Sequence, residues 1–165
     1  MNLKMPALQA ALEEDGFTEV KTLLSSGNVV FSGRRASDTA IEKKIETTIE
    51  KNVGKRFGVI VRSIDELQAL IDADPYRVYR VPAGSKRVVT FLRKEPDKSL
   101  KLPPARDGAR IWGVRGREVL SSYVVSDKGP VFMALIEKTF GKDVTTRTWD
   151  TVLKVAKAGS AAGAG

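Results

Sequence analysis

The sequence predicts an α+β protein with antiparallel sheets. Two segments, 20–32 and 109–125, have the β-rich, turn-interrupted pattern of hairpins, and helical segments follow each of them. Chains that mix hairpins with helices favour antiparallel sheets, whereas a doubly wound parallel fold needs strands and helices in alternation. The content of 42% hydrophobic and 29% charged residues is ordinary for a globular protein.

The first elements are expected to be a helix and a hairpin. Apolar side chains recur at helical spacing over residues 5–15, until a glycine ends the run. Two β-rich runs follow at 20–25 and 28–32. They meet at Ser26 and Gly27, where glycine supplies the positive φ of a tight turn.

A second helix, a short strand and a third helix come next. Ser37 is placed to cap a helix in which isoleucines recur every four residues, and Gly54 ends it. The apolar run 57–62 is expected to be a strand. Ser63 and Glu66 then form an S-x-x-E capping box, which predicts a helix that stops before the next proline.

The remaining segments predict a central strand, a second hairpin and two closing helices. The run 87–93 is apolar enough for a central strand, and the polar, proline-containing stretch 94–108 reads as a loop, with room for one helical turn at 99–102. The second hairpin is expected to turn at Gly116. The closing helices are expected over two ranges, 130–140 and 149–158, followed by a flexible low-complexity tail at 159–165.

Composition excludes several kinds of chemistry. The 165 residues include no histidine and no cysteine, so His-based triads, Cys nucleophiles, thiolate or imidazole zinc sites and disulfides are all excluded. No nucleotide-binding fingerprint is present either. We therefore predict neither cofactor nor metal, and interpret the protein as one without an identifiable catalytic residue. A length of 165 suits one domain or two small ones.

The predicted location is the cytoplasm. The first ten residues lack the apolar core and the small-residue cleavage site of a secretory signal. The longest apolar runs have only a few residues, whereas a helix needs about 20 to span a bilayer. We therefore expect a soluble protein without a membrane partner.

Motifs near both ends of the chain resemble those of a known family. The segments that carry the resemblance are residues 4–12, 16–17, 20–22 and 26–31, together with 138–141 and 145–154. They are similar to the uncharacterised bacterial family called domain of unknown function 1697, although Thr148 stands where that family usually has asparagine. The resemblance implies two α-β plait (ferredoxin-like) halves, and it implies no known activity.

The resemblance also predicts a domain organisation. It implies a first plait half over 1–63, a helix and linker over 64–85, and a second plait half over 86–158. Family members usually begin with a strand and turn reading Leu-Leu-Arg-Gly-Ile-Asn-Val-Gly-Gly, and this chain starts just after it at Met1. Two explanations stay open for this missing first strand. The native chain starts upstream, or a partner strand fills the gap, so we expect either a monomer or a strand-completing homodimer.

Positive charge is concentrated in one segment. The chain carries a formal net charge of +8. Residues 77–117 contain twelve basic and three acidic residues, a net charge of +9, whereas the rest of the chain has 16 basic and 17 acidic residues, a net charge of −1. Four aromatic residues lie in or beside this segment: Tyr76, Tyr79, Phe91 and Trp112.

This basic segment predicts a contact surface for nucleic acid or another polyanion. Lysine and arginine neutralise phosphates, and nearby aromatic rings can stack on unpaired bases. The alternative is a solvated loop with two strand ends in a basic protein. The candidate residues are Lys86, Arg87, Arg93, Arg110, Arg115 and Arg117. Residues 113–116 spell G-x-x-G, but they lie between predicted strands, so we interpret them as a hairpin turn and not as a KH loop.

A second candidate site lies before the last helix. Thr146 and Thr148 offer hydroxyls, Arg147 offers a planar fork of donors, and a helix start offers free backbone N–H groups. These groups suit a phosphate or carboxylate, which would make the protein a small-anion binder or an enzyme. The alternative is plain capping of the helix, with Arg147 paired to a neighbour such as Asp150.

Overall fold

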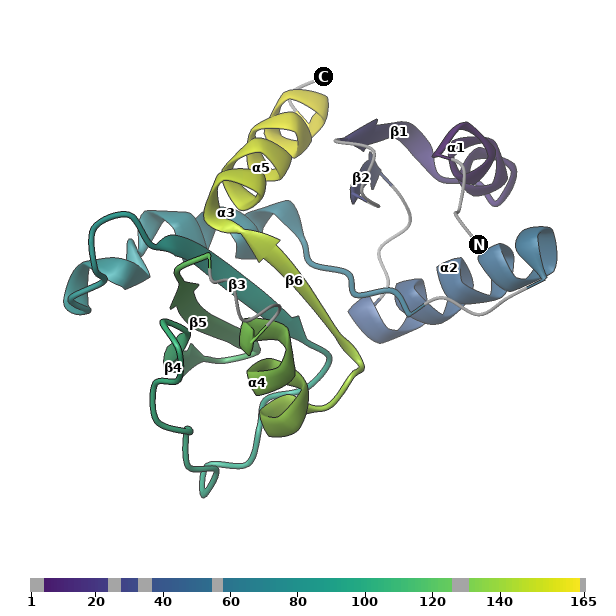
Figure 1. Cartoon of the computed structure of the whole chain (residues 1–165). Coiled ribbons are helices and arrows are strands. Elements are labelled where there is room, and N and C mark those ends of the chain that lie inside the picture. Colours follow the sequence, from purple (N-terminus) through teal and green to yellow (C-terminus); the bar gives the residue numbers. More distant parts are fainter. Residues whose placement is uncertain (1–4, 24–27, 33–36, 55–57, 126–130, 164–165) are drawn as a thin grey trace. The chain divides into compact units, whose positions relative to one another are not determined.

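The computed structural model describes residues 5–23, 28–32, 37–54, 58–125 and 131–163. The chain forms two compact units, one of residues 1–68 with 153–165 and one of residues 69–152. Helices and antiparallel strands occur in both (Figure 1), which confirms the predicted α+β class.

The first unit is built on a two-stranded antiparallel sheet. Its complete elements are α1 (Met5–Glu14), β1 (Thr18–Leu23), β2 (Asn28–Ser32) and α2 (Asp38–Val53). Both helices contribute to its core cluster, which consists of Leu8, Leu12, Phe17, Ile45 and Ile49. The predicted turn at Ser26 and Gly27 lies outside the described residues.

Capping residues define the helices of this unit as the sequence predicts. The Ala40 N–H donates to the Ser37 hydroxyl at 3.2 Å, and Gly54 ends α2 with φ of 79°. At the start of α3 (Ile64–Asp72), the Glu66 N–H donates to the Ser63 hydroxyl at 3.0 Å, and that hydroxyl donates to the Glu66 carboxylate at 3.2 Å. The N-cap bond of the predicted capping box is therefore confirmed.

The strand predicted at 57–62 is wrong over its described part, because residues 58–63 form no strand. Val59 and Val61 pack against the core cluster of the first unit. The Val61 N–H donates to the buried Glu42 carboxylate at 2.8 Å. A strand needs a neighbouring backbone to pair with, and here a side chain accepts the hydrogen bond instead.

The second unit contains a four-stranded antiparallel sheet. Its strands are β3 (Lys86–Leu92), β4 (Arg110–Arg115), β5 (Glu118–Tyr123) and β6 (Val144–Thr148), in the order β4-β5-β3-β6. The β4-β5 hairpin turns at Gly116, as predicted, with φ of 60°. A short 3-10 helix, η1 (Pro75–Val78), precedes β3.

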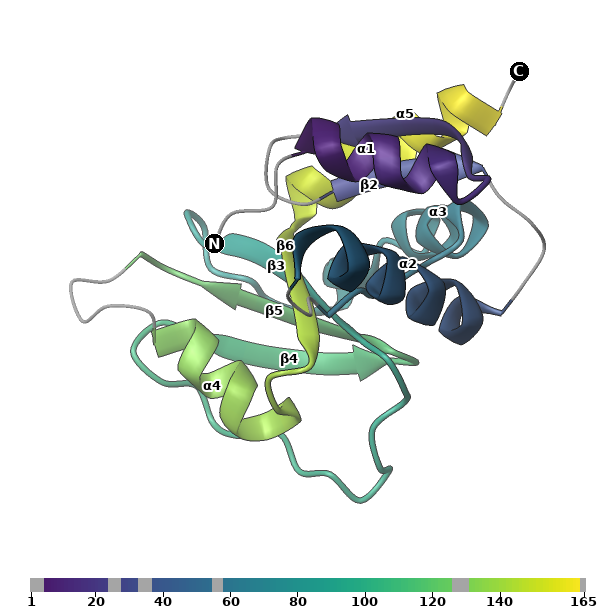
Figure 2. The same ribbon diagram turned by 90° about the vertical axis from the view of Figure 1, so that its right-hand side faces the viewer.

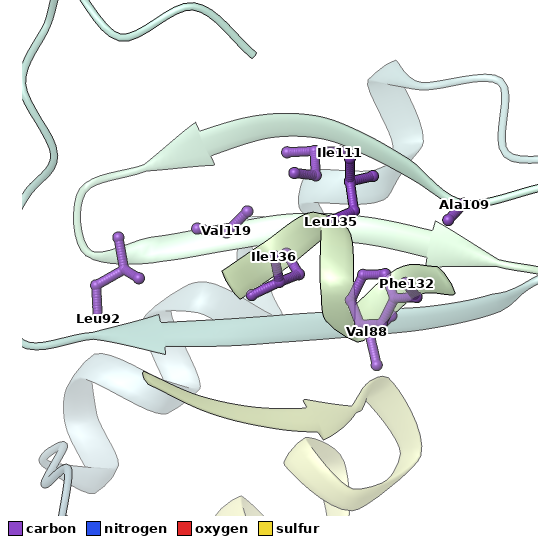
Figure 3. Close-up of a cluster of buried hydrophobic side chains, with 8 residues drawn as sticks. All are labelled: Val88, Leu92, Ala109, Ile111, Val119, Phe132, Leu135 and Ile136. Atoms are coloured by element: carbon purple, nitrogen blue, oxygen red, sulfur yellow. The ribbon is translucent and has the colours of Figure 1, made fainter. Parts of the chain in front are cut away.

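Helix α4 (Val131–Phe140) covers one face of this sheet (Figure 2). Figure 3 shows the core between them: Phe132, Leu135 and Ile136 of α4 lie against apolar side chains of the strands. The strand side chains in this cluster are Val88, Leu92, Ile111 and Val119, with Ala109 just before β4. Gly141 ends α4, as the sequence predicts, and its N–H donates to the Glu137 carbonyl at 2.8 Å.

Other segments differ from the expectations. Residues 94–108 contain no helix, so the turn of helix at 99–102 is wrong. Residues 144–148 form β6, which the sequence does not predict. Helix α5 (Trp149–Gly163) continues beyond residue 158, so residues 159–163 are helical and not a flexible tail. At Gly159 a Cβ atom would lie 2.1 Å from Ile64 Cδ1, so the absent side chain permits close packing.

No helix in the described ranges is both long and apolar enough to cross a membrane.

Candidate functional site

The register of the second sheet decides which basic side chains lie together. Val88, Val119 and Ile111 belong to the core under α4, and side chains alternate between faces along a strand. Arg87 pairs with Ser122, and Ser122 pairs with Arg110. These three residues therefore form one row across β3, β5 and β4, on the face opposite α4.

A β-bulge brings an aromatic ring to this row. The pairing of β4 with β5 shifts between Ile111 and Gly113, which leaves Trp112 as the extra residue. The Trp112 indole N–H donates to the Ser122 hydroxyl at 2.8 Å. The Arg110 guanidinium carbon lies 4.0 Å from the centre of the Trp112 ring, within the range of a cation–π interaction.

Tyr79 packs against the same indole. The two ring centres are 5.5 Å apart and the ring planes are inclined by 32°. Gly113 makes this position possible, because a Cβ atom there would lie 2.2 Å from the Tyr79 hydroxyl oxygen. Gly113 belongs to β4, as do the two residues after it, so the hairpin turn predicted at 113–116 is wrong over 113–115 and correct at Gly116.

Tyr76 supports the second arginine of the row. The Arg87 guanidinium carbon lies 5.6 Å from the centre of the buried Tyr76 ring. The Tyr76 hydroxyl donates to the carbonyl oxygens of Val88, at 2.6 Å, and Ser121, at 3.0 Å. Burial raises the pKa of Tyr76 far above its ordinary value, so the phenol stays protonated and serves as a donor.

We define the arginine–aromatic cluster as Tyr76, Tyr79, Arg87, Arg110 and Trp112. Both arginines are exposed, and within the described ranges neither forms an ion pair. Packing on a ring restricts a guanidinium while leaving donors along its edge for an anion. The cluster therefore presents two ordered cations to solvent.

The other predicted basic residues lie elsewhere. Lys86 pairs in register with Tyr123, whose side chain packs on the α4 face of the sheet. Lys86 therefore lies on the face opposite the arginine–aromatic cluster. Arg93 forms a 2.6 Å ion pair with Asp143 at the far end of β3. Arg115 lies directly opposite Glu118. Arg117 accepts the Leu92 N–H at its carbonyl, at 2.9 Å, beside the same hairpin turn.

The aromatic residues of the basic segment differ in exposure. Phe91 is buried in the sheet and cannot stack on a ligand, although the sequence places it among the candidates. Tyr79 and Trp112 are only half-buried. Accessible ring surface in this region therefore belongs to the cluster.

The side chains of the second predicted site do not point to a common place. Thr146, Arg147 and Thr148 belong to β6, and alternation puts the arginine on the opposite face from the threonines. The Thr146 hydroxyl lies 2.9 Å from the Thr90 hydroxyl.

Capping explains the threonine nearest the helix. The Thr148 hydroxyl accepts the Thr151 N–H at 3.3 Å, which confirms the capping interpretation of this residue. Burial lowers the pKa of Arg147, whose guanidinium donates to the Thr146 carbonyl at 2.8 Å. These bonds are internal to the fold, so the geometry does not form an anion site from the three residues.

The part of the chain that the structure describes contains no group of three or more acidic side chains placed to hold a metal ion.

Sequence reasoning missed Ser122 and the role of Gly113. Serine in a strand carries no particular signal, and Gly113 is also part of an apparent turn motif. Only the shifted register of β4 brings the Ser122 hydroxyl to Trp112 and the Tyr79 ring over Gly113.

Comparison with known proteins identifies the family. The family model described as Protein of unknown function (DUF1697) matches residues 1–119. The chain belongs to the DUF1697 family. Among solved structures, this DUF1697 protein is similar to the conserved bacterial protein SP0830 from Streptococcus pneumoniae, with 18% identity and a TM-score of 0.66. The match covers 94% of this chain and 88% of that one, and at this identity it shows the fold alone. No curated protein matches the chain.

Proposed function

We propose that this DUF1697 protein binds single-stranded nucleic acid through the arginine–aromatic cluster. One observation carries the proposal: two exposed guanidiniums, which form no ion pair with any described residue, lie in one row of the sheet, each over an aromatic ring. Arginines that contact phosphates release counterions from the strand, and this provides affinity without base specificity. Half-buried rings beside them supply stacking surface for unpaired bases.

Two further arginines lie next to the cluster's tyrosines in the sequence. Arg77 and Arg80 are exposed and directly follow Tyr76 and Tyr79. Nucleic acid is favoured over a small anion because the row of arginines spans three strands. A single phosphate is too small to contact both arginines at once. Adjacent strands lie about 4.8 Å apart, so Arg87 and Arg110, with β5 between them, are about 10 Å apart across the sheet.

The test compares two double variants with the same change in charge. R87Q/R110Q removes the row, whereas R93Q/R115Q removes two arginines from the other end of the sheet. Fluorescence anisotropy measures binding of a labelled mixed-sequence RNA of about 12 nucleotides. We expect about tenfold weaker binding for R87Q/R110Q, or ~1.4 kcal/mol. Two lost phosphate contacts should also reduce the slope of log K against log salt by about 1.4.

The control double variant should lose less than about threefold in affinity, because Arg93 is already paired with Asp143 and neither arginine belongs to the arginine–aromatic cluster. Equal losses in the two variants would show that net charge alone matters, and would overturn the proposed site. Absence of binding by the wild-type protein at about 50 mM salt would overturn the function itself. RNA should quench Trp112 fluorescence in a W149F background; inorganic polyphosphate quenching it equally would contradict base stacking.

For the fold, we infer that the second unit is a variant of the α-β plait. The strand order β4-β5-β3-β6 supports this inference, because it is the order of that fold with β3 as the first strand. The departure is the connection from β3 to β4, where a loop replaces the expected helix.

A strand-completing homodimer stays a prediction for the first unit. The observation that favours it is the segment 58–63, which packs Val59 and Val61 on the core yet belongs to no sheet. Light scattering at micromolar concentration tests the prediction. A dimer that the Val61→Pro variant dissociates would support it, and a monomeric wild-type protein would contradict it.

A further inference from the structure

We propose that a pocket in the second unit, separate from the arginine–aromatic cluster, binds a small carboxylate that carries an apolar chain. The pocket lies between the segment 100–107 and α4, and its volume is about 900 Å³. This is within the 300–1,000 Å³ range typical of small-molecule sites. The volume therefore favours a small molecule over a polypeptide.

The pocket has an apolar lining. Leu100, Pro103 and Pro104 line it from the loop, and Ala134 and Leu135 line it from α4. Leu102, between the pocket residues of the loop, packs against the core cluster under α4 and so fixes the loop to the sheet. Leu100 remains 37% exposed beside this apolar lining. An apolar chain in the pocket would remove this surface from water.

The charged residues around the pocket are mainly basic. Lys101 and Arg106 line it from the loop, and Lys138 lines it from α4. Asp107 is the acidic residue of the lining, and its carboxylate is 4.0 Å from the Arg106 guanidinium. Within the described residues, Lys101 and Lys138 form no ion pair. Two unpaired ammonium groups beside an apolar surface complement a ligand with one negative end and one apolar end.

The hydroxyl of the pocket's threonine is already used inside the fold. The Thr139 hydroxyl donates to the Leu135 carbonyl at 2.8 Å, within α4. It therefore does not require a polar group in the body of the ligand. This distribution of polar and apolar groups predicts that the head group, and not the chain, determines selectivity.

The experiment titrates the full-length protein with octanoate, below the concentration at which octanoate forms micelles, and follows backbone amide chemical shifts. We expect saturable shifts confined to residues 100–107 and 131–139. 1-Octanol should bind at least about fivefold more weakly, because it lacks the charge that the lysines recognise. K138Q should weaken octanoate binding about fivefold for the same reason.

The matched control is K142Q, because Lys142 is an exposed lysine just beyond α4 and does not line the pocket. It should leave octanoate binding unchanged. A134F should abolish binding by filling the pocket, with its thermal unfolding checked in parallel. Equal effects of K138Q and K142Q, or shifts spread over the protein, would overturn the proposal. R87Q/R110Q should leave octanoate binding intact, so the two proposed sites fail or succeed independently.

Discussion

The two ends of β3 carry arginines in different surroundings. At its start, Arg87 lies over Tyr76, and Arg110 of the neighbouring hairpin lies over Trp112, without ion pairs among the described residues. Just past its end, Arg93 is only 2.6 Å from the Asp143 carboxylate. The same type of residue is therefore available to a ligand at one end and already paired at the other.

This difference shows why the net charge of a segment is a poor guide to a binding site. An arginine beside a carboxylate must lose that partner before it binds a phosphate, whereas an arginine over a ring keeps its partner. At the paired end, carboxylates of Glu95 and Glu118 also lie near Gly116. The basic segment 77–117 thus contains arginines that lie over aromatic rings and an arginine, Arg93, that is already paired with a carboxylate.

The largest effect is expected from removing the Tyr76 hydroxyl, at the end of β3 where the arginines lie over aromatic rings. Y76F retains the ring but loses the hydroxyl that bonds the Val88 and Ser121 carbonyls. Denaturant unfolding should show a loss of about 1–2 kcal/mol, because the buried phenol loses its hydrogen bonding and a typical hydrogen bond contributes about 0.5–1.5 kcal/mol. The control is Y123F, whose half-buried ring stacks on Phe132, with a loss below about 0.5 kcal/mol. Equal losses in the two variants would contradict the anchoring role.

The pH dependence of the unfolding free energy should also report on the Tyr76 hydroxyl. The pKa of Tyr76 in the folded protein lies above the value of 10.0 expected when unfolded, because burial disfavours the phenolate. The unfolded state therefore loses this proton first, and stability that is present below pH 10 falls as pH rises above it. The slope is about 1.4 kcal/mol per pH unit. This slope is reached only above pH 10, so between pH 9 and 11 urea unfolding should show wild type losing about 1.4 kcal/mol more stability than Y76F.

A smaller loss of stability is expected when the contact between Tyr79 and Trp112 is disturbed. In G113A the new Cβ atom displaces the Tyr79 hydroxyl, which stood 2.2 Å away. We expect a loss of about 1 kcal/mol, because the end of one side chain can move aside. Near-ultraviolet circular dichroism should report the changed Tyr79–Trp112 contact.

The Y79A background provides the control for this variant. There G113A should be neutral or stabilising, because alanine is favoured over glycine in a strand by about 0.5–1 kcal/mol. A G113A penalty that persists without the Tyr79 ring would show that the glycine is needed for another reason.

The smallest effect is expected at the paired end. R93Q removes an ion pair whose side chains are 26% and 67% exposed, so unfolding free energy should change by less than about 1 kcal/mol. The change should shrink further in high salt. D143N serves as the reciprocal control. An R93Q loss of RNA affinity equal to that of R87Q would remove the distinction between the two ends.

Local signals were sufficient for most helices. Ser37, the Ser63–Glu66 box and Gly141 each act within a few residues of the backbone groups that they satisfy. Such bonds depend on spacing along the chain, which the sequence displays. The hairpin turn at Gly116 is local in the same way.

Strands that depend on distant partners were not predictable in this way. Four of the five residues 144–148 are polar, yet the segment forms β6 because β3, more than 50 residues earlier, offers its edge. Residues 58–62 are apolar, yet no strand forms there. A strand exists only where another backbone supplies the hydrogen bonds, and residue types alone do not disclose that neighbour.

By itself the sequence determined the α+β class, the capped helices and the excess of positive charge in residues 77–117. It also excluded chemistry based on histidine and cysteine. Tertiary structure decided which of the twelve basic residues stand together. The reason is that strand register and one β-bulge, set by pairing between distant segments, place Arg87, Ser122 and Arg110 in a row and turn Trp112 toward it.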